Sequence, residues 1–147
     1  MTLAVNLESD DFRFYKTLHE DVLLKPDKYN KWDIQFYNGD WVNVSGHDSL
    51  KNAICIAIMT RYQELQEMSL YKDFGCRIHE LIKENTSYMH FYKMELFIED
   101  VLKNMRRIHK INEISVEESV DDEGFKHRIS FSVTSISDEL VEGSVIV

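Results

Sequence analysis

The residue types that most often carry chemistry are scattered singly along this 147-residue chain. Its six histidines include no HExxH motif, and none stands at a metal-ligand spacing from cysteine or carboxylate neighbours. The two cysteines, Cys55 and Cys76, form no CxxC pair, so we expect inert thiols in a reducing compartment. The five glycines also stand apart, which disfavours a phosphate-binding loop. The sequence therefore predicts no metal and no cofactor.

Paired carboxylates are the one constellation that could hydrolyse a sugar polymer. That reaction needs two carboxyl groups facing each other across a cleft, and Glu64 with Glu80 is one candidate pair. Such a pair is easily nominated among 26 acidic residues, so it has little specificity. We expect a protein with no catalytic residues, and a lysozyme-like cell-wall hydrolase is the alternative.

A basic cluster stands out in an otherwise acidic chain. Arg106 and Arg107 lie with His109 and Lys110 between a predicted helix and a predicted strand. They either complement the negative end of the helix dipole or present a guanidinium pair to carboxylates or carbonyls of a partner. The residues alone leave both interpretations open.

The overall charge restricts the possible partners. Seventeen basic and 26 acidic residues give a formal net charge of -9. Such a field repels phosphate backbones and anionic lipids, so neither nucleic acid nor a membrane is expected as a partner. The longest mostly apolar segment, residues 53–59, is far shorter than the roughly 20 residues of a membrane-spanning helix. The first residues lack the pattern of an export signal, so we expect a cytoplasmic protein.

The chain divides into two segments by pattern. Residues 1–31 mix alternating apolar residues with charges and are predicted to form an extended arm. An edge strand and loop of the same domain is the open alternative for this segment. Residues 32–147 are long enough for a single hydrophobic core and are predicted to form one α+β domain.

A β-hairpin is predicted at the start of this domain. Asn38 and Gly39 form a dipeptide that tolerates the two positive φ angles of a type I′ turn. That turn would place Phe36 opposite Trp41 on the same face of the hairpin.

Helical spacing of apolar residues follows the hairpin. It predicts a core helix over residues 50–61, opened by Asp48 or Ser49 as the capping residue. A shorter helix is predicted over residues 76–83, and a long amphipathic helix begins near Ser87.

The apolar period changes to two after Arg107. Residues 114–120, 125–133 and 141–147 alternate and predict three antiparallel strands, the last running to the final residue. A terminal strand of this kind invites another chain to pair with it. The predicted fold class is thus α+β: two to three helices packed on a C-terminal antiparallel β-meander, with an N-terminal β-hairpin and extended arm.

Four features occur in a defined order: a hairpin ending at Gly46, an apolar helix over residues 50–61, the Phe74-Gly75 pair in LYKDFGCRIHELI, and a long helix running into MRRIHKINEISVEE and a β-meander. With these features, residues 32–147 resemble the baseplate wedge or sheath-initiator family of contractile phage tails, R-type bacteriocins and the type VI secretion baseplate. Many members carry Glu-Pro-Arg before the first C-terminal strand. This chain has Met105, Arg106 and Arg107 there, so only Arg107 matches.

The resemblance implies a structural subunit around the tail tube, assembled in the bacterial cytoplasm into the baseplate of a phage tail or tail-like particle. Its sheet would accept strands from the first sheath ring. The expected partners are the sheath protein, baseplate wedge proteins, and tube or hub proteins. A cytoplasmic adaptor unrelated to tails is a further alternative. The expected partner-binding residues are Phe74, Gly75, Arg106, Arg107, Leu140, Val141, Val145 and Val147.

Overall fold

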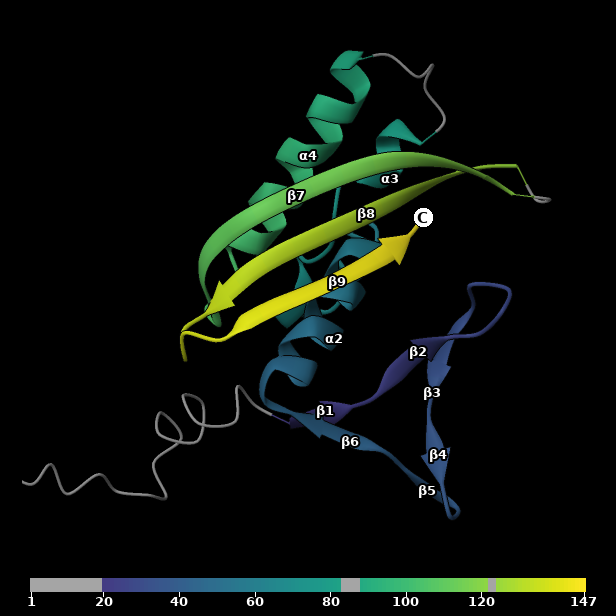
Figure 1. Cartoon of the computed structure of the whole chain (residues 1–147), viewed down its shortest axis with the longest axis vertical. Coiled ribbons are helices and arrows are strands. Elements are labelled where there is room, and N and C mark those ends of the chain that lie inside the picture. The colour runs from purple at the N-terminus through teal and green to yellow at the C-terminus, as the bar shows by residue number, and fades with distance from the viewer. Residues whose placement is uncertain (1–19, 83–87, 122–123) are drawn as a thin grey trace, which may run out of the picture.

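A computed structural model describes residues 20–82, 88–121 and 124–147 of the chain. A three-stranded antiparallel sheet lies against helices on one face, and residues 20–45 form short ribbons beside this body (Figure 1). The predicted fold class, α+β with helices on a C-terminal meander and an N-terminal hairpin, is confirmed. No helix within the described ranges is long and apolar enough to cross a lipid bilayer.

The sheet is the predicted meander. Its strands, in the order β7-β8-β9, are β7 (Ile108–Asp121), β8 (Gly124–Ser135) and β9 (Leu140–Ile146). Burial alternates along the central strand, where Ile129, Phe131 and Val133 are buried and the residues between them are not. One face of the sheet therefore belongs to the core, and the other is polar.

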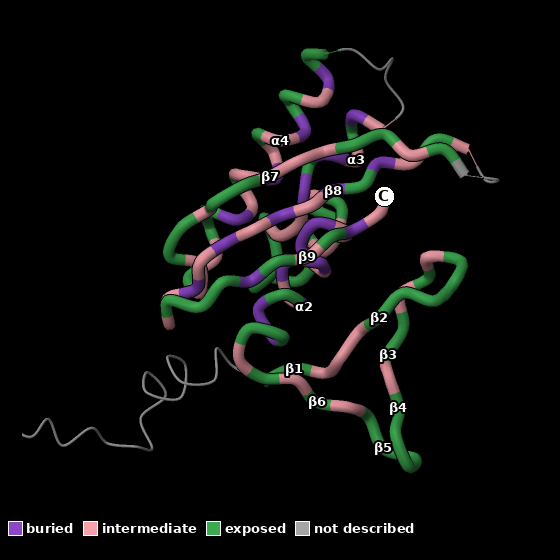
Figure 2. The backbone as a smooth tube through the Cα atoms, in the orientation of Figure 1, coloured by how far each residue is buried: buried purple, intermediate pink, exposed green. Residues whose placement is uncertain are grey.

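Two helices cover the inner face of the sheet. Helix α2 (Gly46–Met59) lies against β9, and helix α4 (Tyr88–Lys103) lies against β7. Figure 2 shows the buried residues gathered where these helices meet the sheet. Each helix buries one stripe of side chains at a spacing of four residues: Leu50, Ile54 and Ile58 on α2, and Met94, Ile98 and Leu102 on α4.

Two predicted helix boundaries are wrong. Helix α2 begins at Gly46, before the expected capping residues, and its N-cap Ser45 makes no side-chain capping hydrogen bond. Ser49 is instead buried within the helix. The second helix is reduced to α3 (Ile78–Leu81), preceded by the single turn η1 (Ser69–Tyr71). The predicted ends at Lys83 and Ser87 lie outside the described residues.

Backbone contacts shorten that second helix. The N–H of Cys76 donates to the carbonyl oxygen of Thr60 at 2.8 Å, so the chain just before α3 is tied to the end of α2. Gly75 lies where these segments cross, with φ +113°. A Cβ atom there would stand 2.4 Å from the carbonyl oxygen of Arg61, which is too close for any real Cβ contact. Glycine has no Cβ atom and therefore fits at this position.

The N-terminal part consists of three two-stranded ribbons that meet at one point (Figure 1). They pair β1 (Glu20–Val22) with β6 (Asn43–Ser45), β2 (Leu24–Pro26) with β3 (Trp32–Ile34), and β4 (Phe36–Tyr37) with β5 (Asp40–Trp41). A ring of three backbone hydrogen bonds closes the junction. The N–H of Leu23 donates to Val42 at 2.8 Å, that of Val42 to Gln35 at 2.9 Å, and that of Gln35 to Leu23 at 3.1 Å.

One buried side chain attaches these ribbons to α2. The Asn52 Oδ1 atom accepts from the backbone N–H of Leu24 at 3.0 Å. Its Nδ2 atom donates to the carbonyl oxygen of Val22 and to a carboxylate oxygen of Asp21, both at 3.1 Å. With the amide satisfied, its burial in the helix is no longer costly.

The predicted hairpin is confirmed in its register. Phe36 stands opposite Trp41, and Asn38 and Gly39 have φ angles of +51° and +81°. Both aromatic side chains are exposed, as the colouring of β4 and β5 in Figure 2 shows. The predicted boundary at residue 31 falls in the turn between the paired strands β2 and β3, and residues 1–19 of the predicted arm lie outside the described residues.

Two histidines are buried where α4 faces β8. The ring centroids of His90 and His127 are 5.7 Å apart, and the Phe91 ring lies 6.1 Å from that of His127. Neither ring nitrogen of His127 has a hydrogen-bond partner in the described part of the chain. Burial lowers the pKa of His127, nearby His90 lowers it further, and Glu118 opposes the shift. The fold therefore holds His127 in its neutral form.

We predict that Gly75→Ala destabilises the fold more than Gly124→Ala does. Gly124 has φ +117°, close to the value at Gly75, but no atom stands within 4 Å of its Cβ position. The control variant, Gly124→Ala, is therefore destabilised only by backbone strain, about 1–3 kcal/mol. Gly75→Ala adds overpacking against Arg61, a further 1–3 kcal/mol approximately. Urea denaturation measures both, and equal losses would contradict the close backbone crossing.

We predict that the stability of the protein falls as the pH drops below about 6.5, the value for an unperturbed histidine. The unfolded chain binds a proton there, whereas folded His127, with its lowered pKa, does not. One such group changes the free energy of unfolding by at most about 1.4 kcal/mol per pH unit. His127→Leu should flatten the profile of unfolding free energy against pH and leave neutral stability nearly unchanged. A profile of unchanged slope in the variant would contradict this assignment.

Candidate functional site

The free edge of β9 carries unpaired backbone groups. His127 and Val147 exchange both backbone hydrogen bonds, at 2.8 and 2.9 Å. In an antiparallel ladder such pairs alternate, so every odd-numbered residue of β9 points its backbone groups towards β8. The N–H and C=O groups of Leu140, Glu142 and Ser144 therefore point to the opposite side. β9 is the last strand in the described sheet, and these groups lie at its edge.

A groove runs beside this edge. It has a volume of about 680 Å³, and its walls come from β9, from α2 and from the ribbon of β2 and β3. Leu23, Leu24, Pro26 and Trp32 give the ribbon wall an apolar character. The indole Nε1 atom of Trp32 is buried and has no acceptor in the described ranges. A buried donor without a partner costs free energy, so an added acceptor here would be stabilising.

One hydrogen bond already joins the ribbon of β2 and β3 to the free edge of β9. The Asn30 Nδ2 atom donates to the carbonyl oxygen of Ile146 at 2.9 Å, across 116 residues of sequence. Asn30 lies in the turn between β2 and β3, with φ +58°. The carbonyl of Ile146 on the free edge is thus capped by a side chain of the ribbon. Within the described residues, no side chain of the ribbon caps the carbonyls of Glu142 and Ser144 in this way.

The opposite edge of the sheet has a different character. β7 is interrupted by two register shifts, one between Ile108 and Lys110 and one between Ile111 and Glu113. Bulges of this kind twist an edge and discourage pairing with a further strand. The pairing of β8 with β9 runs through seven consecutive residue pairs without a shift. The irregularity of β7 is confined to its start, because its pairing with β8 from Glu113 to Asp121 also runs without a shift. What distinguishes the β9 edge is that it borders the groove.

The predicted C-terminal site residues divide between core and edge. Val141 and Val145 are buried against the helices, whereas Leu140 is exposed and Val147 is partly buried. The side chains of Val141 and Val145 thus belong to the hydrophobic core. At the free edge of β9, the groups available to a partner are therefore backbone N–H and C=O groups.

The two arginines of the basic cluster have different surroundings. Arg106 is exposed, whereas Arg107 is half-buried and donates from a terminal guanidinium nitrogen to the Ser49 hydroxyl at 3.4 Å. Burial lowers the pKa of Arg107, and nearby Asp21 opposes the shift. Its carbonyl oxygen also accepts from the N–H of Ile136. Arg107 therefore joins α2 to the end of β8.

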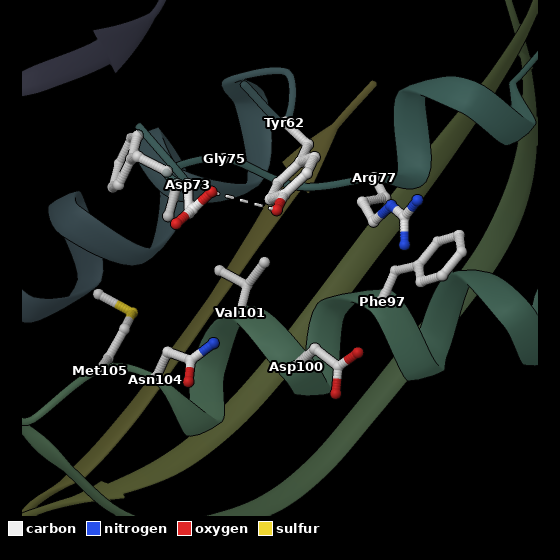
Figure 3. Close-up of a pocket in the computed structure, with 11 residues that line it drawn as sticks. Tyr62, Asp73, Gly75, Arg77, Phe97, Asp100, Val101, Asn104 and Met105 are labelled. Carbon is white, nitrogen blue, oxygen red and sulfur yellow. Dashed lines mark hydrogen bonds between the residues drawn. The ribbon is translucent and has the colours of Figure 1, made fainter. Parts of the chain in front are cut away.

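Phe74 and Gly75 line a separate pocket of about 410 Å³ (Figure 3). The opposite wall comes from α4, including Val101, and from the residues just after it, including Met105 next to the basic cluster. The predicted residues Phe74 and Gly75 are thus brought close to the α4–β7 connection. No lining residue comes from the sheet, so the pocket is distinct from the groove.

The residues nominated for chemistry are engaged locally. A Glu64 carboxylate oxygen accepts from the N–H of Arg61 at 3.0 Å, and Glu80 pairs with Arg77 at 3.6 Å. Burial raises the pKa of both Cys55 and Cys76 to about 11, so their thiols stay protonated at neutral pH. Among the described residues no group of three or more His, Cys, Asp or Glu side chains could hold a metal ion.

These features define an α+β domain with an open strand edge, and one solved structure has a similar fold. It is the crystal structure of a "putative tail lysozyme" from Geobacter sulfurreducens, with a TM-score of 0.57 and 18% sequence identity. The similarity covers 68% of this chain and 87% of that one. At this identity the comparison establishes a shared fold. No protein-family model matches the sequence, and no curated protein matches it.

Sequence reasoning missed the residues that build the groove. Trp32 and Asn52 line the groove, Asn30 bonds the end of β9, and all three act through contacts with distant segments. Such contacts leave no periodic pattern, and only the turn residue Asn30 follows a recognisable preference, that of asparagine for positive φ.

We predict that Arg107→Met lowers the free energy of unfolding by about 1–2 kcal/mol, because it removes a charged hydrogen bond from a half-buried site. The matched variant Arg106→Met should change it by no more than about 0.5 kcal/mol, as is usual for an exposed residue. Chemical denaturation of both variants would measure the two free energies of unfolding. The reverse order would contradict the structural role of Arg107.

Proposed function

We propose that this protein is a noncatalytic baseplate subunit of a contractile injection particle, which templates the first sheath ring by β-strand addition. The observation that carries the proposal is the unpaired edge of β9, regular over seven residue pairs, beside a groove with one apolar wall. The shared fold with a protein named as a tail lysozyme adds support for a role in a tail. The order of elements from residue 32 onward, with its resemblance to sheath initiators, agrees with this role.

In the proposed mechanism, the free backbone groups of Leu140, Glu142 and Ser144 pair with an extended arm of a sheath subunit. Each backbone hydrogen bond formed in place of one to water contributes about 0.5–1.5 kcal/mol. Alternate side chains of the arm enter the groove beside Leu24 and Trp32, and the others face solvent. The main chain supplies most of the affinity, and the groove selects the register.

Docking on the baseplate uses a different surface in this proposal. Exposed Arg106 and the pocket of Phe74 and Gly75 face the wedge proteins, with tube or hub proteins as further neighbours. Assembly takes place in the bacterial cytoplasm. Neither nucleic acid nor a membrane has a part in it, in keeping with the net charge of -9.

Cell-wall hydrolysis is the alternative suggested by the name of the structural neighbour. It would require two carboxylates facing each other across a cleft. Glu64 and Glu80 line neither the groove nor the pocket of Phe74, which argues against this pair. Release of peptidoglycan fragments by the purified protein, lost on a single carboxylate substitution, would favour hydrolysis over templating.

We predict that Glu142→Pro abolishes nucleation of sheath, whereas Glu118→Pro does not. Both residues are exposed, and the backbone N–H of each faces a free edge, β9 for Glu142 and β7 for Glu118. Proline removes that donor and places a ring at the edge, at β9 in one variant and at β7 in the other. Electron microscopy of each variant mixed with the sheath protein encoded beside it would measure ordered sheath.

Circular dichroism should show that both variants are folded, because neither substitution removes a bond to β8. Nucleation by Glu142→Pro at the level of the unmodified protein would refute strand addition at β9. Equal loss in both variants would also refute it, since the two edges would then act alike.

A further inference from the structure

The pocket beside Phe74 combines aromatic, aliphatic and acidic walls. Tyr62 and Phe74 approach from the segment after α2, and Phe97 and Val101 approach from α4 (Figure 3). With a volume of about 410 Å³, the space can take one long side chain but no folded element. Apolar walls of this kind suit the aliphatic stem of a long side chain, whose charged end needs polar partners of its own.

The pocket already contacts one guanidinium group. The Cζ atom of Arg77 lies 5.4 Å from the centroid of the Tyr62 ring and 5.6 Å from that of Phe97. Both distances fall within the range of a cation–π interaction. Figure 3 shows Arg77 at one end of the pocket, between these two rings. The rings of Tyr62 and Phe97 are thus already engaged by a guanidinium of this chain.

The remaining part of the pocket is acidic. Asp73 and Asp100 line it from opposite walls, and Asn104 adds a carboxamide one helical turn after Asp100. Asp73 accepts a long hydrogen bond from the Tyr62 hydroxyl, at 3.5 Å. In the described part of the chain, neither Asp73 nor Asp100 has a cationic side chain within ion-pair distance. Arg77 is directed to Glu80 instead, at 3.6 Å.

We propose that this pocket binds an arginine side chain of a partner protein. The guanidinium would lie between the carboxylates of Asp73 and Asp100, which match its forked donors, and its stem would pack on Val101 and Phe74. Charge complementarity with the two carboxylates selects a cation, and two acceptors on opposite walls favour the forked donors of arginine over the point charge of lysine. The inference does not depend on sheath templating, because no residue of β9 lines the pocket.

The test is a nuclear magnetic resonance titration of the full chain with three blocked peptides, Gly-Arg-Gly, Gly-Lys-Gly and Gly-citrulline-Gly. Citrulline keeps the shape of arginine and lacks its charge. The arginine peptide is expected to shift the amide signals of Gly75, Val101 and Asn104 with a dissociation constant on the order of millimolar. The citrulline peptide should bind at least about ten-fold more weakly.

Two variants and a matched control locate the site. Asp100→Asn and Asp73→Asn, both at exposed positions, should each weaken the arginine peptide about ten-fold. Glu99→Gln should leave binding unchanged, because Glu99 lies outside the pocket and pairs with Lys103 at 2.8 Å. Equal binding of the citrulline or lysine peptide would overturn the proposal, as would an equal loss in Glu99→Gln or the absence of any shift.

Discussion

The burial of alternate side chains of the sheet against α2 and α4 is the constraint on which the other features depend. In an antiparallel strand, side chains alternate between faces while backbone groups alternate between edges, both with period two. Val141, Gly143 and Val145 point their backbone groups towards β8, so those of Glu142 and Ser144 must point away from it. The open edge of β9 is thus a consequence of how the core is filled. A shift of the β9 register by one residue would lose both the buried side chains and this arrangement of the edge groups.

The same periodicity explains which parts of the fold could be predicted. The two amphipathic helices, the meander and the Phe36–Trp41 register follow from local spacing, because each repeats over several residues or uses a turn-specific dipeptide. The ribbons of β1 with β6 and of β2 with β3, the groove and the shortened α3 could not be predicted. The ribbons and the groove depend on the backbone ring at Leu23 and on the amide of Asn52, and the start of α3 depends on the bond from Cys76 to Thr60. All of these contacts join segments apart in sequence.

The predicted site residues illustrate a related limit. Arg106 and Arg107 are adjacent and chemically identical, yet one is exposed and the other binds Ser49 from a half-buried position. A sequence gives the composition of a cluster but not the direction of each side chain at an irregular connection, where neither helical nor strand periodicity holds. Gly75 likewise lines the pocket, but the backbone of Arg61 is what requires glycine there.

Open strand edges promote unwanted pairing, and the two edges of this sheet limit it by different means. β7 carries bulges at its start, and there they would also exclude a wanted partner. β9 keeps a regular edge, but the ribbon of β2 and β3 stands opposite it and Asn30 takes the carbonyl of Ile146. Under the proposed function, an arm that pairs along the whole edge must replace this one hydrogen bond. Because the exchange is nearly neutral in free energy, the fit of apolar side chains beside Trp32 decides which arm binds.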